Sequence, residues 1–160
     1  MSSGSGAQNG VVSMTHVGLC VSDLDRSLRF YTEGLGFEAA DGIDIDDGLA
    51  PLAEVLAPIQ CRAQFITHGS TTIELLGWRH PAAEGTASTS RRQLGFTHLA
   101  VNVDDLAAVE ARLVALGARV LEDTRTHVDI PGGGLDIVFL ADPDGVRIEL
   151  SQFTVAAMQR

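Results

Sequence analysis

The sequence predicts an α+β domain built from two tandem β-α-β-β-β modules, and an internal repeat is the main reason. Residues 15–24 (THVGLCVSDL) align with residues 97–106 (THLAVNVDDL), with Thr, His, Val, Asp and Leu coinciding. Residues 65–76 (FITHGSTTIELL) match residues 139–151 (FLADPDGVRIELS), which have one extra residue in the turn. A length of 160 residues suits one domain, so we expect the two modules to pack side by side.

Each module is expected to begin with a strand followed by a helix. Asp23 and Asp104 occupy the position of a helix N-cap in the two copies. Both helices are predicted to end at a Leu-Gly pair (35–36 and 116–117), where glycine takes the left-handed conformation. Between these ends, apolar residues recur at helical spacing: Leu24, Leu28 and Tyr31, and then Leu106, Val109, Leu113 and Leu116.

Three further strands complete each module, and the last two form a hairpin. The hairpin turns are predicted at Gly69-Ser70 and at residues 142–145 (DPDG), and the strand after each turn carries Ile-Glu-Leu. Residues 41–61 insert a short helix, predicted at 49–57, into the first module. We expect this insert to roof a cavity in which an apolar or bulky ligand would sit.

These elements give the predicted domain boundaries. The linker between the modules is rich in Pro, Gly, Ser and Thr, and the Ser/Gly-rich N-terminal stretch is expected to be flexible. The prediction is an N-terminal tail at 1–13, one domain at 14–153 made of a first module (14–78), a linker (79–95) and a second module (96–153), and a C-terminal tail at 154–160.

Composition excludes several classes of protein. The net charge of −10 and the pI near 4.7 argue against a surface that neutralises nucleic-acid phosphates. No apolar run approaches the roughly 20 residues that span a bilayer, and the N-terminus lacks the basic start and apolar stretch of a signal peptide. We therefore expect a cytoplasmic protein without a membrane partner. Its two cysteines, Cys20 and Cys61, are predicted to be buried thiols.

Four residues are predicted to form a metal site. In the first strand of each module, His16 and His98 lie on the face opposite the apolar side chains, with a small residue two positions on. Glu74 and Glu149 are flanked by aliphatic residues in the last strands, where an unpaired buried carboxylate would cost several kcal/mol. On one curved sheet the four side chains would bind one divalent cation and leave about two of six positions open.

A simpler interpretation exists for each of these residues taken alone. A strand histidine is often a hydrogen-bonded structural residue, and a glutamate in Ile-Glu-Leu can face solvent. The recurrence of His and then Glu at equivalent places favours the metal site, although duplication alone can preserve a structural histidine.

His68, His80 and His127 have no counterpart in the repeat and are expected in solvent-facing loops. Of these, His127 beside the PGGG turn (131–134) is placed to reach a ligand.

These segments resemble the vicinal oxygen chelate superfamily, which includes glyoxalase I, methylmalonyl-CoA epimerase, extradiol dioxygenases and the bleomycin and fosfomycin resistance proteins. The resemblance covers residues 14–153 and implies a cupped, mixed sheet around a metal site. It looks most like glyoxalase I in the ligand set His16, Glu74, His98 and Glu149. The motifs that carry it are 15–31 (THVGLCVSDLDRSLRFY), 71–76 (TTIELL), 96–106 (FTHLAVNVDDL) and 142–150 (DPDGVRIEL).

The resemblance implies a lyase or isomerase that transfers a proton next to a carbonyl or thioester through a metal-bound enediolate. Zn, Ni, Co, Mn or Fe(II) would polarise the carbonyl oxygen. One carboxylate would act as the general base, Glu149 as the first choice and Glu74 as the second. Glyoxalase I holds the glutathione carboxylate with an arginine four residues after its first His and an asparagine four residues after its first Glu. Here those positions are Cys20 and Trp78.

Other activities stay open. A methylmalonyl-CoA epimerase abstracts a proton in the same way, but its HPKD-like stretch is replaced by ADPDG (141–145). An extradiol-type dioxygenase needs three open positions on Fe(II), and Glu74 would occupy one. A non-catalytic antibiotic-binding protein needs no metal and usually lacks the ligands kept here. The expected partners are a small-molecule substrate, either an α-oxo aldehyde thiol adduct or an acyl-CoA, and a second copy in a homodimer. The site would form within one chain or across two chains with exchanged modules.

Overall fold

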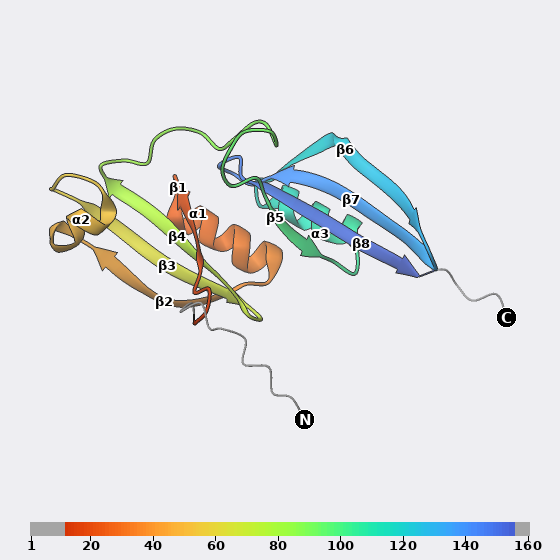
Figure 1. Ribbon diagram of the computed structural model, residues 1–160, viewed down its shortest axis with the longest axis horizontal. Coiled ribbons are helices and arrows are strands. Elements are labelled where there is room, and N and C mark those ends of the chain that lie inside the picture. The colour runs from red at the N-terminus through yellow and green to blue at the C-terminus, as the bar shows by residue number, and fades with distance from the viewer. Residues whose placement is uncertain (1–11, 156–160) are drawn as a thin grey trace, which may run out of the picture.

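The structure of the protein is a computed structural model, and residues 12–155 are the part of the chain that it describes. Two four-stranded sheets lie side by side, the first on the left of Figure 1 and the second on the right. The predicted tails therefore fall largely outside the described residues. Within the C-terminal tail predicted at 154–160, residues 154 and 155 belong to the last strand instead.

The first module has one helix and four strands. Its sheet has the order β1-β4-β3-β2, with β1 parallel to β4 and the other pairs antiparallel. The helix continues into a π-helical turn, η1 (Phe30–Gly34). The elements are β1 (Val17–Val21), α1 (Leu24–Arg29), β2 (Glu38–Ile45), β3 (Gln60–His68) and β4 (Thr71–His80).

The second module repeats this topology, with the sheet order β5-β8-β7-β6 and β5 parallel to β8. The α+β fold and its internal repeat are thus confirmed. Each module of residues 12–155 contributes one four-stranded mixed sheet to this fold. The elements are β5 (Leu99–Asn102), α3 (Leu106–Ala115), β6 (Arg119–Ile130), β7 (Gly133–Ala141) and β8 (Arg147–Val155).

The helix ends follow the predicted pattern with one correction. The Asp23 carboxylate caps α1 by accepting from the backbone N–H of Arg26 at 3.0 Å. In α3 the cap is Asp105 and not Asp104, because the helix begins one residue later than predicted. The glycines after both helices, at positions 36 and 117, have φ angles of 74° and 100°, which is the left-handed conformation expected there.

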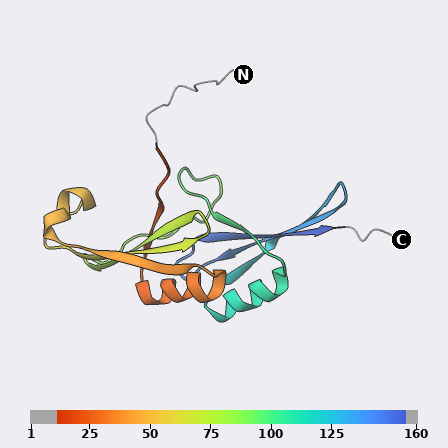
Figure 2. The ribbon, with the colours of Figure 1, turned by 90° about the horizontal axis from the view of Figure 1, so that it is seen from below.

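Both helices lie on the same side of the two sheets, below them in Figure 2. They contact each other, since a Cβ added to Gly34 of η1 would lie 2.6 Å from Leu113 of α3. One apolar core therefore joins the modules. The strand residues that face the helices are those predicted from alternation, and the most buried of them are Leu19, Val21, Ile73, Leu75, Ile148 and Leu150.

Polar contacts also hold the modules together at the turn between β7 and β8. The Tyr31 hydroxyl donates to Oδ2 of Asp142 at 2.9 Å, and both side chains are buried. Burial is the main cause that raises the pKa of Asp142, and it also raises the pKa of Tyr31 well above its usual value. Asp144 accepts from the Arg26 guanidinium at 2.7 Å. The DPDG turn thus docks the first module as well as closing a hairpin.

The helix within the insert of the first module is shorter than predicted. A 3-10 turn, η2 (Asp47–Leu49), leads into the four-residue helix α2 (Ala50–Ala53), in place of a helix over 49–57. The helix stops because Glu54 adopts a left-handed conformation, with a φ angle of 55°. The insert rises on the side of the sheets opposite the helices (Figure 2), and it exposes three leucines, at positions 49, 52 and 56.

The cysteine prediction holds for one residue. Cys61 is buried and Cys20 is exposed, and both thiols are free. The prediction was wrong for Cys20 because strand alternation places it on the face that no helix covers. Among residues 12–155, no helix is long and apolar enough to cross a membrane.

Candidate metal centre

The four predicted ligands form two pairs, one on each sheet. By strand alternation they lie on the side of the sheet turned away from the helices, which we call its open face. His16 directly precedes β1, and its Nε2 lies 3.4 Å from Oε2 of Glu74 in β4. His98 directly precedes β5, and its Nε2 lies 3.3 Å from Oε2 of Glu149 in β8. The parallel pairing of the first and last strand of each module produces both contacts, so the two pairs are built in the same way.

Each histidine ring is also held at its other nitrogen. Thr15 Oγ1 lies 3.1 Å from Nδ1 of His16, and Thr97 Oγ1 lies 2.8 Å from Nδ1 of His98. A hydrogen bond at Nδ1 fixes the ring orientation and leaves Nε2 for a metal, which is how metal-binding histidines are usually supported. The Thr-His dipeptide, present in both repeats, is the signal in the sequence for this support, and it was missed.

An aromatic ring stands beside each pair. The ring of Phe65 lies edge-to-face against His16, with centroids 5.4 Å apart, and Phe139 lies in the same way against His98 at 5.2 Å. Phe65 is paired with Glu74 in the sheet register, and Phe139 is paired with the glutamate of the second pair. These phenylalanines were also missed, although they open the two aligned segments 65–76 and 139–151.

The geometry of each pair fits neighbouring ligands of one divalent ion. Nitrogen and oxygen ligands about 2.0–2.2 Å from a metal are separated by roughly 2.8–3.1 Å when they are adjacent in octahedral coordination, and by roughly 3.3–3.6 Å in tetrahedral coordination. The separations of 3.4 and 3.3 Å match the tetrahedral spacing and exceed the octahedral one by a few tenths of an ångström. A mixed set of imidazole and carboxylate suits Zn, Ni, Co, Mn and Fe(II).

The structure does not bring the two pairs together. Residues 12–155 contain no group of three or more His, Cys, Asp and Glu side chains placed to hold a metal ion. The pairs belong to different sheets, in which β1 and β5 each have a strand neighbour on one side only. One chain therefore presents two separate His–Glu pairs, and a four-ligand metal site remains a prediction. We call His16 with Glu74 the first half-site, and His98 with Glu149 the second half-site, of that predicted site.

The other histidines lie in or at the ends of strands, not in loops. His68 ends β3, where its ring lies 5.5 Å from that of Phe37, and His80 ends β4. His127 lies in β6, and its Nδ1 is 2.7 Å from Oδ1 of Asp136. That hydrogen bond is the main cause that raises the pKa of His127.

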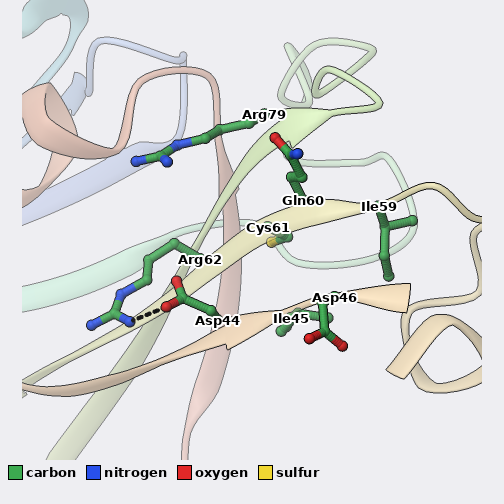
Figure 3. Close-up of a pocket in the computed structure, with 8 residues that line it drawn as sticks. All are labelled: Asp44, Ile45, Asp46, Ile59, Gln60, Cys61, Arg62 and Arg79. Carbon is green, nitrogen blue, oxygen red and sulfur yellow. Dashed lines mark ion pairs between the residues drawn. The ribbon is translucent and has the colours of Figure 1, made fainter. Parts of the chain in front are cut away.

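A cavity of about 350 Å³ lies at one end of the first sheet (Figure 3). Arg62 and Asp44 form an ion pair of 3.2 Å at its edge. Burial is the main cause that raises the pKa of Cys61 in its wall to about 11. None of the four predicted ligands lines this cavity, so it is not the candidate site. Its lining is Asp44, Ile45, Asp46, Ile59, Gln60, Cys61, Arg62 and Arg79.

The linker rises over the sheets on the side opposite the helices (Figure 2). The Arg147 guanidinium donates to the backbone carbonyls of Ser88 and Thr89. Further along, the Arg91 guanidinium carbon lies over the ring of Phe139, 4.6 Å from its centroid. The linker was predicted only as a connection between the modules, whereas Arg91 places it against the ring beside His98.

The chain is similar to several curated enzymes. It is 34% identical over 159 residues to a 2-epi-5-epi-valiolone epimerase from Actinomyces sp, covering 92% of this chain and 83% of that protein. It is 33% identical to a probable lactoylglutathione lyase from Vibrio parahaemolyticus, covering 86% and 88%. It is 29% identical to an ethylmalonyl-CoA/methylmalonyl-CoA epimerase from Cereibacter sphaeroides, covering 87% and 96%.

A solved structure and a family model agree with these similarities. A glyoxalase family protein from Bacillus cereus superposes with a TM-score of 0.77 at 18% identity, covering 92% of this chain and 97% of that one, which supports the fold. Residues 13–150 match the model of the Glyoxalase/Bleomycin resistance protein/Dioxygenase superfamily. The resemblance seen in the sequence motifs is thereby confirmed, and the chain belongs to this superfamily.

Proposed function

We propose that the chain is a divalent-metal-dependent enzyme that moves a proton at a carbon next to a carbonyl or thioester, as a glyoxalase-like lyase or isomerase. The observation that carries this proposal is the duplicated His–Glu pair, in which each histidine is held at Nδ1 by a threonine. Relatives named as a lyase and as epimerases support the reaction class.

The metal ligands in this proposal are His16, Glu74, His98 and Glu149. A divalent ion held by them supplies a Lewis acid that polarises the carbonyl oxygen of the substrate. Each carboxylate lies within 3.4 Å of its partner histidine and is only partly exposed. The phenylalanine beside each pair keeps water from one side of the site.

Glu149 is proposed as the residue that takes the proton from carbon and returns it. Its side chain is 22% exposed, against 16% for Glu74, so a substrate on the open face reaches it more readily. Glu74 is the second candidate. Return of the proton to a neighbouring atom gives an isomerase, whereas return to the opposite face of the same carbon gives an epimerase. Two carboxylates on opposite sides of a substrate allow either outcome.

The complete site is proposed to form between two copies of the chain. The two half-sites of residues 12–155 lie apart, and each belongs to a sheet whose first strand has a free edge. In a homodimer with a twofold axis, the first half-site of one copy would meet the second half-site of its partner, and the symmetry would repeat the arrangement. Such a dimer has two sites, which is one metal ion for each chain.

Metal analysis of the purified, metal-loaded protein tests the ligand assignment. We expect about one equivalent of Zn, Ni, Co, Mn or Fe(II) per chain, and a clear reduction in His98→Ala and Glu149→Gln. Less than roughly 0.1 equivalent of every one of these metals would contradict the proposal. Unchanged metal content and turnover in both variants would show that the ligands were assigned wrongly.

An epimerase that works without glutathione is the second candidate. Cys20 and Trp78 stand where glyoxalase I has the arginine and asparagine that hold the glutathione carboxylate, and neither a thiol nor an indole makes an equivalent charge-assisted contact. Deuterium uptake from D₂O distinguishes the candidates. The substrates would be methylglyoxal hemithioacetals of glutathione and of smaller thiols, and methylmalonyl-CoA. Exchange at the background rate with every substrate would contradict the proton-transfer function.

A further inference from the structure

We infer that Arg91 in the linker is a specificity residue that binds an anionic oxygen group of the substrate beside the second half-site. This inference rests on the proposed function, because it names the class of substrate that the site accepts. The substrate would carry a carboxylate, or a group of similar charge, on the side remote from the carbon that loses its proton.

Arg91 and the second half-site share one aromatic ring. The Arg91 guanidinium carbon lies 4.6 Å from the centroid of the Phe139 ring, and the His98 imidazole lies 5.2 Å from the same centroid. Phe139 is 4% exposed and is the sheet partner of Glu149. A substrate that reaches the half-site from the open face therefore passes the guanidinium.

The linker that carries Arg91 is held by the strand that carries Glu149. Arg147 lies two residues before that glutamate, so the two side chains share a face of β8. The Arg147 guanidinium donates to the carbonyls of Ser88 and Thr89. A turn then follows, in which the N–H of Gln93 donates to the carbonyl of Ser90 at 3.1 Å. Arg91 lies within this turn and is thus positioned by the site's own strand.

The N–H donors of the Arg91 guanidinium are available to bind a ligand. A guanidinium over a ring uses its face for the contact, and its N–H groups, which lie in the plane, can bind a carboxylate at two points. None of the ion pairs within residues 12–155 includes Arg91, whereas Arg26, Arg62 and Arg125 each have a carboxylate partner. In a chain with a net charge of −10, a free cation at this place favours an anionic substrate locally.

Two hydroxamates that differ by one carboxylate test the inference. Benzohydroxamate and 4-carboxybenzohydroxamate would be titrated into Co(II)-loaded protein, and binding followed through Co(II) absorption and the fluorescence of Trp78, the single tryptophan. We expect the carboxylated probe to bind about tenfold more tightly, as one charge-assisted contact would give. Arg91→Gln should abolish this preference. Arg92→Gln, which removes the neighbouring exposed charge, should keep it.

The outcomes separate this inference from the proposed function. If the Co(II)-loaded protein binds the two probes with equal affinity, or if Arg91→Gln keeps the preference for the carboxylated probe, the anion site is wrong. The metal site then stands. An equal loss in Arg92→Gln would show a general charge effect and would also overturn it. If no Co(II) binds, the proposed function fails, and Arg91 is tested alone by phenylglyoxal labelling. Terephthalate should then slow the labelling of Arg91 and leave Arg92 unaffected, and equal labelling would overturn the inference.

Discussion

The two modules carry the same His–Glu pair in different surroundings. In the first module the open face next to His16 and Glu74 holds an exposed thiol, Cys20, and the insert beyond it exposes leucines. In the second module the ring beside the pair is covered, because the linker lies over it and brings a guanidinium. The ligand geometry agrees to 0.1 Å between the modules, at 3.4 and 3.3 Å, while the neighbours differ in polarity and charge.

In the proposed metal site, this difference would separate two roles. The features that agree between the modules are the imidazole nitrogen, the carboxylate oxygen and the hydrogen bond at the other imidazole nitrogen. A metal ion would require all three. The parts that differ are those that a substrate meets, namely an apolar side and a charged side. If two half-sites from two chains join, a substrate would lie between an apolar wall from one copy and a cationic wall from the other.

Mixing two inactive variants gives the largest expected effect. One variant, His16→Ala with Glu74→Gln, loses the first half-site, and the other, His98→Ala with Glu149→Gln, loses the second. Each alone should lose metal and turnover completely. After subunit exchange, half of the dimers are mixed and each has one intact site, so about a quarter of the wild-type metal content and activity should return.

The mixing experiment decides where the site forms. If all four ligands came from one chain, mixing would restore nothing, because every chain has a damaged half-site. Native mass spectrometry should confirm that mixed dimers have formed, since absent exchange would also give no recovery. Wild-type protein mixed with either variant serves as the control for losses during the exchange step.

Single substitutions of the carboxylates test whether the two half-sites are chemically equivalent. Glu149→Gln should lower turnover by about 10²–10⁴-fold, the usual contribution of a general base. Glu74→Gln should lower it less if that residue acts mainly as a ligand. Metal content, measured beside the rate, separates loss of the ion from loss of the base. A greater loss of rate in Glu74→Gln, at equal metal content, would reverse the assignment.

Much of this arrangement was predictable from the sequence. Alternation in a strand places His16 on the face opposite the buried Leu19 and Val21, and the repeat predicts the same for His98. The side chains that face the helices were therefore predicted correctly in both sheets. The left-handed conformation of the glycines after the helices was also predicted correctly, because glycine is strongly preferred at that position. These features depend on local pattern and on the repeat.

The features that were missed depend on contacts between distant segments. Nothing near Arg91 in the sequence indicates that its side chain covers Phe139, which lies in β7 and far from the linker along the chain. The contact between Tyr31 and Asp142 likewise joins the two modules. Whether the four predicted ligands meet within one chain or across two was left open, because it depends on how the modules pack, and a repeat in the sequence does not specify that packing.

The hairpin turns of the two modules should differ strongly in their contribution to stability. Asp142→Ala would leave the Tyr31 hydroxyl and two backbone N–H groups without their acceptor. We expect the free energy of unfolding to fall by about 3 kcal/mol, measured by urea denaturation. Tyr31→Phe should cost about 1 kcal/mol. Ser70→Ala, in the exposed turn of the first module, should change it by less than about 0.5 kcal/mol.

The pH dependence of Asp142 has a defined sign. Burial raises the pKa of this carboxyl, so the folded protein binds its proton more tightly than the unfolded chain does. Between the ordinary aspartate pKa of about 3.9 and the raised value, unfolding releases the proton, and stability falls as the pH rises. As the pH rises through this interval, the free energy of unfolding of the wild-type protein should therefore fall relative to that of Asp142→Asn. A wild-type advantage that grows with pH would contradict this.

The threonines behind the histidines should have a smaller effect on metal binding than the predicted ligands have. Thr97→Val should weaken metal affinity by roughly tenfold, the lower end of what loss of a supporting hydrogen bond costs. Thr15→Val should weaken it less, because that contact is longer, 3.1 Å against 2.8 Å, and is exposed to water that can replace it. Competition with a chelator measures both affinities, and the serine variants, which keep the hydroxyl, should bind as the wild type does. Equal effects of the two valine variants would mean that the half-sites hold the ion equally well, and that their difference lies only in the surfaces offered to the substrate.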